Sequence, residues 1–306
     1  MVRIGRCGRL PCNVVREAIG FIGRALITVG ILVLLFVGYQ LWGTSWFEAR
    51  AQDDLTAEFE AKLAAAPSTT AAPDPAVTTP PVVTQPLTGE AVAIIRIPKI
   101  GVDRTVVSGI GRDDLRKGPG HYPNTPMPGQ IGNAAIAGHR TTYGAPFFDL
   151  AELMEGDEIN VQTITGEYTY RVVRSFVVNP NQVEVLAPTS TPTLTLTTCE
   201  PKYSAAKRLI VQAELVPEQS AAPTEPVISD TTAESVSLDE EGLSGDPGEI
   251  GPVLLWLGIL ALVGAAWWLL FHRYHRIWTW LVGVVPFALV LFVFYSHLER
   301  MLPANY

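Results

Sequence analysis

The sequence has little charge and no excess of basic residues. Only 17% of its 306 residues are charged, 48% are apolar, and the formal net charge is −8. This balance excludes the basic surface that nucleic-acid-binding proteins present, so we expect no nucleic acid as a partner. So many apolar residues with so few charges predict membrane-spanning segments in addition to a globular core.

Cysteine is also scarce. The chain has three: Cys7 and Cys12 precede the first apolar run, and Cys199 stands alone in the middle. We interpret Cys7 and Cys12 as reduced cytosolic thiols, with palmitoylation or metal binding as alternatives. If the middle of the chain lies outside the membrane, Cys199 is a thiol without a nearby partner in an oxidising place, and it calls for a functional explanation.

Three long apolar runs are present. The first, 25–42, follows an arginine-rich start and approaches the roughly 20 residues that span a bilayer, so we predict an uncleaved anchor with a cytoplasmic N-terminus. A signal peptide is the alternative, because 49–51 has the small-x-small form of a cleavage site, but the run is long for one. The runs 253–271 and 277–295 flank the short basic segment 272–276, which predicts a cytoplasmic turn between two spans.

These patterns predict a multi-pass protein of the cell membrane with one extracytoplasmic domain. Its predicted parts are a basic cytoplasmic start (1–24), an anchor (25–45), a stalk and Pro/Thr-rich linker (46–89), a folded extracytoplasmic domain (90–216), an acidic disordered linker (217–251), a second span (252–271), a basic loop (272–276), a third span (277–296) and a tail (297–306). Within the stalk, 46–63 has the spacing of a short amphipathic helix.

The domain 90–216 reads as mostly β. Short β-branched runs alternate with Gly, Pro, Asn and Asp, which favours a barrel or a sandwich, and a closed barrel would leave no exposed edge. The predicted strands are 91–97, 102–107, 134–137, 158–163, 168–178, 183–186, 193–198 and 208–215. Short helices are predicted at 113–116 and 147–153.

Three residues in this domain have the chemistry of a nucleophilic site. Cys199 and Arg208 end one predicted strand and begin the next, and His139 ends another. A thiolate is favoured by a nearby imidazole or guanidinium, an imidazole can protonate a leaving amine, and a guanidinium can stabilise an oxyanion. On spacing alone the bland alternatives stay open: a buried structural cysteine, a turn histidine and a solvated arginine.

The local sequence resembles the sortases. Thr-Leu-Thr-Thr-Cys at 195–199, with Arg208 nine residues later, is similar to the TLxTC…R signature of that family, and Gly-His-Arg at 138–140 to its histidine segment. The strings His-Tyr-Pro (121–123) and Gly-His-Arg-Thr-Thr-Tyr-Gly-Ala-Pro-Phe (138–147) resemble class E sortases of high-GC Gram-positive bacteria. The resemblance covers roughly residues 92–215.

The resemblance implies a closed eight-stranded β-barrel and a cysteine transpeptidase that anchors surface proteins. Such an enzyme cleaves an LPxTG or LAxTG sorting signal between Thr and Gly. Cys199 would attack the Thr carbonyl, His139 would move the proton, and Arg208 would hold substrate and oxyanion. The implied supporting residues are Thr198, the backbone N–H of Glu200, Tyr143 and His121; for His121 a turn histidine, and for Tyr143 a loop-packing aromatic, are the alternatives.

The implied partners are secreted proteins with sorting signals, an amine from a peptidoglycan precursor or a pilin lysine, and the lipid bilayer. A C-terminal membrane segment is better associated with pilin-polymerising class C sortases, but no Asp-Pro-aromatic lid precedes residue 91, so class E-like anchoring is favoured. Two further functions stay open: a cysteine hydrolase, and a non-catalytic scaffold that binds wall components. We expect no cofactor; calcium is conceivable at Glu152, Glu155, Asp157 and Glu158, where a solvated loop is favoured.

Overall fold

A computed structural model of the chain describes residues 12–65, 86–226, 246–272 and 277–302. The chain divides into two compact units, one ending at Gly43 and one beginning at Thr44, and each is described by itself. The predicted turn at 272–276 lies outside the described residues except for His272, and so do Cys7 and the parts 66–85 and 227–245 of the two predicted linkers.

The first unit is helical. Its described residues form α1 (Cys12–Gly38) and a short π-helical segment, η1 (Tyr39–Gly43). Leu26 and Leu34 are among many apolar side chains of α1 that stay exposed. Such a helix is suited to lipid for two reasons: its side chains are apolar, and its backbone N–H and C=O groups are hydrogen-bonded within the helix.

Among the residues that the structure describes, three helical stretches are long and apolar enough to cross a membrane. One includes the predicted anchor, and the others contain α4 (Ile250–Phe271) and α5 (Ile277–Met301) of the second unit. The two predicted C-terminal spans are therefore helices, as expected. However, α5 runs to Met301, so the first residues of the predicted tail 297–306 are helical.

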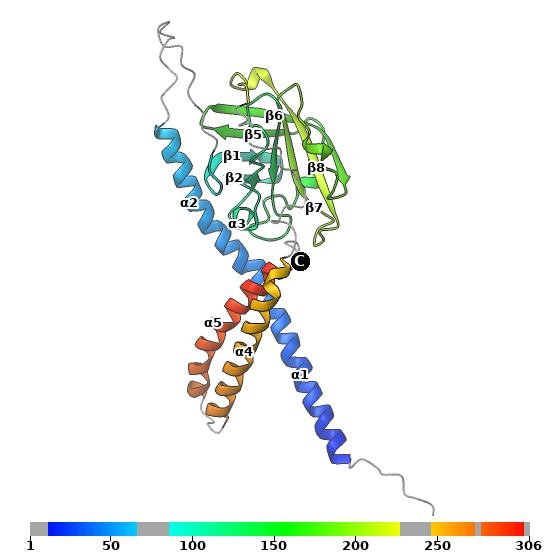
Figure 1. Cartoon of the computed structure of the whole chain (residues 1–306), viewed down its shortest axis with the longest axis vertical. Helices are drawn as coiled ribbons and strands as arrows, with labels where there is room; N and C mark the ends of the chain where they lie inside the picture. Colours follow the sequence, from blue (N-terminus) through cyan, green and yellow to red (C-terminus); the bar gives the residue numbers. More distant parts are fainter. Residues whose placement is uncertain (1–11, 66–85, 227–245, 273–276, 303–306) are drawn as a thin grey trace, which may run out of the picture. The chain divides into compact units, whose positions relative to one another are not determined.

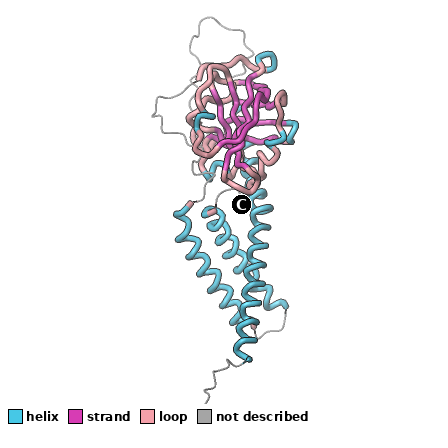
Figure 2. Tube along the Cα trace, turned by 90° about the vertical axis from the view of Figure 1, so that its right-hand side faces the viewer, coloured by secondary structure: helices cyan, strands magenta, loops and turns pink. Residues whose placement is uncertain are grey.

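The centre of the second unit is a closed barrel of eight strands (Figures 1 and 2). Around the barrel the order is β1-β2-β3-β4-β7-β8-β6-β5. The pairs β2–β3 and β4–β7 are parallel, and the other neighbours are antiparallel. The strands are β1 (Ala91–Ile97), β2 (Val102–Ser108), β3 (Gly120–His121), β4 (Asn133–Ala137), β5 (Glu158–Thr163), β6 (Gly166–Val178), β7 (Thr193–Glu200) and β8 (Lys207–Leu215).

The prediction of an eight-stranded barrel is confirmed, but one predicted strand is wrong. Residues 183–186 form a 3₁₀ helix, η4 (Val183–Leu186), and the eighth strand is the two-residue β3. The β-branched run of η4 does not enter the sheet because a side chain takes up its backbone carbonyls. The side-chain amide of Asn133 donates to the carbonyls of Val185 (3.0 Å) and Ala187 (3.2 Å).

The other short elements lie between the strands. The two predicted short helices are present as α3 (Arg112–Leu115) and the 3₁₀ helix η3 (Leu150–Glu152). The described residues also form the 3₁₀ helices η2 (Pro98–Ile100), η5 (Pro217–Gln219) and η6 (Pro247–Glu249).

Alternate strand residues form two separate buried clusters. Leu196 belongs to the large cluster that fills the barrel, whereas Ala137 and Cys199 belong to a second cluster. Because successive side chains of a strand point to opposite faces, this second cluster lies on the outer face of the sheet. Leu115 of α3 and Leu186 of η4 complete it. Cys199 therefore sits outside the barrel core, and its side chain is fully buried in this second cluster.

Helix α2 (Thr44–Ala65) packs on the barrel, whereas the sequence predicted a stalk over 46–89. The side-chain amide of Gln52 accepts from Thr105 N (2.8 Å) and donates to Thr105 O (2.9 Å) and Lys117 O (2.8 Å). Leu55 and Phe59 are buried against β1 and β2. The prediction of a helix is confirmed, but its polar docking residues gave no sign that it belongs to the domain.

The start of the predicted disordered linker 217–251 is also attached to the barrel. The backbone N–H of Ala221 donates to Glu167 O (2.9 Å), and Ser220 Oγ accepts from Thr169 N (3.0 Å). Thr224 forms an isolated β-bridge with Gln130. The domain therefore extends beyond the predicted boundary at 216.

We expect Leu55→Ala to destabilise the domain by about 2–4 kcal/mol, because it leaves a cavity between α2 and the barrel. Leu87→Ala is the matched control: Leu87 is 72% exposed, and its truncation should change stability by about 0.5 kcal/mol or less. Urea titration of the full chain in detergent, followed by circular dichroism, measures both. Equal, small effects would contradict the docking of α2.

Candidate active site

Three adjacent strands bring His139, Cys199 and Arg208 into one row. Cys199 on β7 lies opposite Arg208 on β8. On the other side of β7, Ala137 of the parallel strand β4 lies opposite Thr197. His139 follows two residues after β4, in the loop at the same end of the sheet as Cys199. Residues that pair across strands point to the same face, so the side chains of Cys199 and Arg208 share the outer face.

Hydrogen bonds extend this register past the end of β4. Gly138 N donates to Thr197 O (3.1 Å), and the hydroxyl of Thr198 donates to Gly138 O (2.7 Å). After the histidine, Arg140 Nη1 donates to Cys199 O (3.2 Å). His139 is thus tied to β7 on both sides. The hydroxyl of Thr198 is used in this link, whereas the resemblance to sortases implied that it supports the oxyanion.

Arg140 has a role that sequence reasoning missed. Its side chain is 3% exposed and also contacts the carboxylate of Glu200 (3.0 Å) and the carbonyl of Phe148 (2.8 Å). A guanidinium has five fixed N–H donors, which suits it to join three acceptors at once. The only signal in the sequence was its position directly after His139.

The row is buried, which controls the protonation of the histidine. Cys199, Arg208 and His139 are 0%, 1% and 2% exposed. Burial, together with the positive charges of Arg116 and Arg112, lowers the pKa of His139 to about 3. The imidazole is therefore neutral at pH 7, and the same burial makes it a weaker base than an ordinary histidine.

Polar groups in and beside the row lack partners among the described residues. Neither ring nitrogen of His139 has a hydrogen bond there, and nor does the buried hydroxyl of Thr197 on the same face. Such groups cost about 1–3 kcal/mol each when nothing satisfies them. Arg208 is fixed at Nη1 by the carbonyls of Ala205 (3.0 Å) and Lys207 (3.1 Å). A polar ligand that reached the row would satisfy these groups, and the 0–2% exposure of the three side chains requires the residues that cover them to move first.

The next polar positions along this face hold η4 in place. Thr195 Oγ1 donates to Asn133 Oδ1 (2.7 Å), and Gln212 Nε2 donates to Thr195 Oγ1 (3.3 Å) and to Val185 O (3.3 Å). These hydrogen bonds hold η4 against the outer face of the sheet, beside Thr195 and therefore nearer the start of β7 than Cys199 is. An extended ligand that lay along β7 on this face would run beside η4.

Comparison with known proteins shows the family of this chain. The sortase domain family matches residues 95–216. Sortase D of Bacillus subtilis is 35% identical over 136 residues, which cover 43% of this chain and 67% of that protein. The chain belongs to the sortase family.

Other sortases are similar as well. Sortase SrtE1 of Streptomyces coelicolor is 33% identical over 215 residues, or 65% of this chain, but the match spans only 57% of that protein. A crystal structure of sortase E1 from the same organism, with a tripeptide in the active site, is 32% identical, and the alignment covers 44% of this chain and 91% of that one, with a TM-score of 0.41.

The resemblance to sortases implied two further supporting residues, His121 and Tyr143. The structure gives the contacts of both. His121 is buried on β3, where its Nε2 contacts Pro126 O (2.9 Å) and Thr125 Oγ1 (3.3 Å). Tyr143 is 3% exposed and packs on the ring of His139, with 5.2 Å between ring centroids.

No metal centre is found among the residues that the structure describes: none of their His, Cys, Asp and Glu side chains gather in groups of three or more that could hold an ion. In the acidic loop, Asp157 instead contacts Lys99 Nζ (2.7 Å) and Met154 N (2.6 Å). These hydrogen bonds, first of all that from Lys99, lower the pKa of Asp157.

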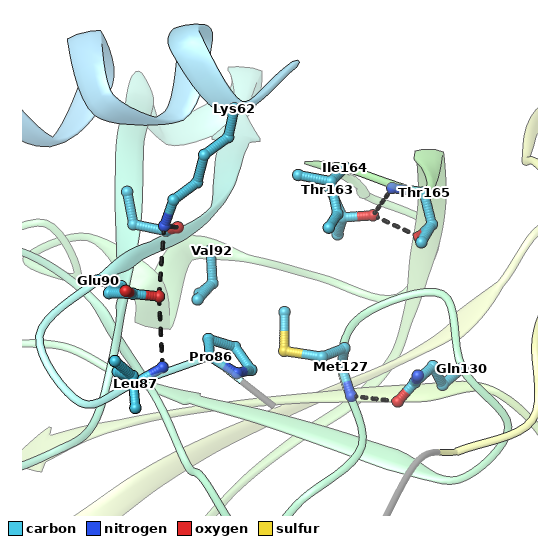
Figure 3. A pocket seen from close by; sticks show the side chains of 11 residues that line it. Lys62, Pro86, Leu87, Glu90, Val92, Met127, Gln130, Thr163, Ile164 and Thr165 are labelled. Carbon is cyan, nitrogen blue, oxygen red and sulfur yellow. Dashed lines mark hydrogen bonds and ion pairs between the residues drawn. The ribbon is translucent and has the colours of Figure 1, made fainter. Parts of the chain in front are cut away.

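A separate cavity of about 450 Å³ lies where the end of α2 meets the barrel (Figure 3). Val92 and Met127 point into it, and Lys62 and Glu90 line its edge as an ion pair of 3.4 Å. The residues that line it do not include His139, Cys199 or Arg208. Its lining is mostly apolar, so it is unsuited to nucleophilic chemistry.

Acid should destabilise the folded domain because two histidines are buried in the neutral form. Burial lowers the pKa of His121 to about 4 and that of His139 to about 3, against 6.5 for an ordinary histidine. Below pH 6.5 the unfolded chain therefore binds more protons than the folded chain. The free energy of unfolding decreases as the pH is lowered from 6.5 to about 4 for His121 and to about 3 for His139. From pH 7 to pH 5 each histidine should cost about 2 kcal/mol.

The His121→Gln variant should lose about half of this pH dependence, because Gln keeps an N–H donor for Pro126 O but does not titrate. Urea titrations of the full chain at pH 7 and pH 5 measure it. A variant that loses as much stability as the unmodified chain would show that His121 is not the cause.

Proposed function

We propose that this chain is a membrane-anchored cysteine transpeptidase that cleaves an LPxTG- or LAxTG-type sorting signal between Thr and Gly. The acyl group is then joined to an amine of a cell-wall precursor. Membership of the sortase family supports the reaction class. The observations that support the site most directly are that β7 and β8 pair Cys199 with Arg208, and that the buried, neutral imidazole of His139 has no hydrogen-bond partner among the described residues.

Acylation begins with the transfer of the thiol proton. The neutral imidazole of His139 accepts the proton of Cys199 while the sulfur attacks the carbonyl carbon of the Thr residue of the signal. The carbonyl oxygen becomes an oxyanion, which the guanidinium of Arg208 and the backbone N–H of Glu200 stabilise. Burial strengthens this interaction, because little water competes with the donors.

The second proton transfer releases the leaving group. His139, now an imidazolium, donates its proton to the nitrogen of Gly as the C–N bond breaks, leaving a thioester on Cys199. An incoming amine attacks this thioester, and His139 takes the proton that the amine loses and returns it to the sulfur. One residue thus acts as base and acid in turn, and no proton is gained or lost overall.

The surroundings of the row suit an extended peptide. The hydroxyl of Thr197, which has no partner in the described part of the chain, lies near Cys199 on the same face, where it can bond to a substrate backbone group. The segment of η4, held by Asn133 and Gln212, forms a border along this face. A peptide that runs beside η4 would present its carbonyl to Cys199.

The apolar helices suit an enzyme that meets its substrates at the membrane. The proposed orientation has a cytoplasmic N-terminus and an extracytoplasmic barrel, which places the site where secreted proteins with a sorting signal emerge. Similarity to sortases E and D favours surface-protein anchoring over the alternative, pilin polymerisation, in which the acceptor would be a lysine.

The test uses the full chain in detergent with LPxTG and LAxTG peptides, with and without an amine acceptor. We expect a thioacyl adduct on Cys199 by mass spectrometry and a product that contains the acceptor. Cys199→Ala should form neither. Arg208→Lys should lower kcat/KM by about 10²-fold, because a point charge does not replace the fixed fork of donors.

Arg171→Lys is the matched control, because Arg171 is an exposed residue of β6 paired with Glu158; it should keep full activity. Normal turnover by Cys199→Ala would remove the proposed chemistry. Product that never contains the acceptor would show a hydrolase in place of a transpeptidase.

A further inference from the structure

The loop that follows His139 has an unusual backbone. Tyr143, Gly144 and Ala145 have φ angles of 49°, 69° and 45°, so three consecutive residues are left-handed. Two of them carry a Cβ, which makes this conformation unfavourable. Such a turn persists only where its surroundings hold it, and strained turns of this kind are concentrated at functional sites.

Helix α2 holds the turn from one side. The backbone N–H of Tyr143 donates to Thr44 Oγ1 (3.3 Å). At Gly144 a Cβ would lie 2.4 Å from Glu48 Oε2, so the helix and the turn are in close contact. Glu48 is buried and is itself fixed by an ion pair with Arg104 (3.0 Å).

The hydroxyl of Tyr143 is held from the other side. It accepts a hydrogen bond from Arg116 Nε (2.7 Å), directly after α3, and donates one to Glu299 Oε1 near the end of α5. Arg116 and Glu299 also form an ion pair (3.6 Å), and their side chains are only 12% and 11% exposed. A phenol that both donates and accepts in this way has one fixed position.

The ring of Tyr143, fixed in this way, packs against the ring of His139. Its centroid lies 5.2 Å from that of the His139 ring, at an interplanar angle of 35°. The backbone of His139 is fixed by Phe147 N, which donates to His139 O (3.1 Å), but no hydrogen bond among the described residues orients its ring. Packing against Tyr143 is therefore what the structure offers to orient the imidazole.

We propose that Tyr143 is a positioning residue for His139, and that Arg116 and Glu299 hold it in place through its hydroxyl. The C-terminal helical hairpin thereby contributes to the geometry of the general acid. This inference rests on the proposed transpeptidase function, because it concerns the residue that protonates the leaving amine. It gives α5 a role in the reaction in addition to any role as a membrane span.

The test compares two substrates that differ only in the leaving group. The first is a sorting peptide with the ordinary Thr–Gly amide, whose nitrogen must be protonated as it leaves. The second is its thioester analogue, whose thiolate leaves without a proton. Full-length Tyr143→Phe and Glu299→Gln are measured on both in detergent, with Tyr168→Phe and Glu158→Gln as matched controls.

If Tyr143 acts through the general acid, both variants should lose about tenfold in kcat on the amide, with KM changed less than about twofold. On the thioester the loss should be clearly smaller, because His139 is then needed only to accept the proton of Cys199 and not to protonate the leaving group. The two controls should behave normally on both substrates, since the hydroxyl of Tyr168 bonds to Thr165 and the carboxylate of Glu158 pairs with Arg171, away from the row.

Four results would overturn parts of this proposal, and they can be told apart. An unmodified chain that forms no acyl-enzyme with either substrate contradicts the proposed function itself. Variants as fast as the unmodified chain on the amide contradict the role of Tyr143. Equal losses on amide and thioester contradict a role through the general acid, and losses that follow a lower Tm show that Tyr143 only stabilises the fold.

Discussion

The parallel register between β4 and β7 is the constraint on which the site depends. It places the chain after Ala137 beside the end of β7, and the antiparallel register with β8 adds Arg208 on the other side. A slip of one residue in either pairing would turn a member of the row to the opposite face of the sheet. The links from Thr198 to Gly138 and from Arg140 to Cys199 secure the register where the regular ladder has ended.

Much of this arrangement could be predicted from the sequence, because β-branched runs between turn residues mark strands that are half buried. Seven of the eight strands follow from such runs, and so do the strand ends at which His139, Cys199 and Arg208 lie. β3 escapes prediction because two residues carry no periodicity. η4 resembles a strand because its composition is that of one, while side-chain bonds from Asn133 decide its conformation.

What could not be predicted is mostly polar and long-range. Gln52 docks α2 on the barrel by its amide, and Arg140 joins three acceptors, yet both look like solvated residues in the sequence. The role of Tyr143 depends on residues far along the chain, such as Glu299, which is 156 positions away. Local patterns cannot indicate which buried polar side chains will find each other across the fold.

The packing of α2 also sets the shortest piece of this chain that can be handled in solution. A fragment cut at the apparent start of the barrel, near residue 90, would expose the side chains of Ala91, Ile94 and Val107 that Leu55 and Phe59 now cover. Newly bared apolar surface beside a sheet promotes self-association. A soluble version should therefore retain the helix from Thr44 onward, and an insoluble shorter fragment would reflect a misplaced cut and not an unstable barrel.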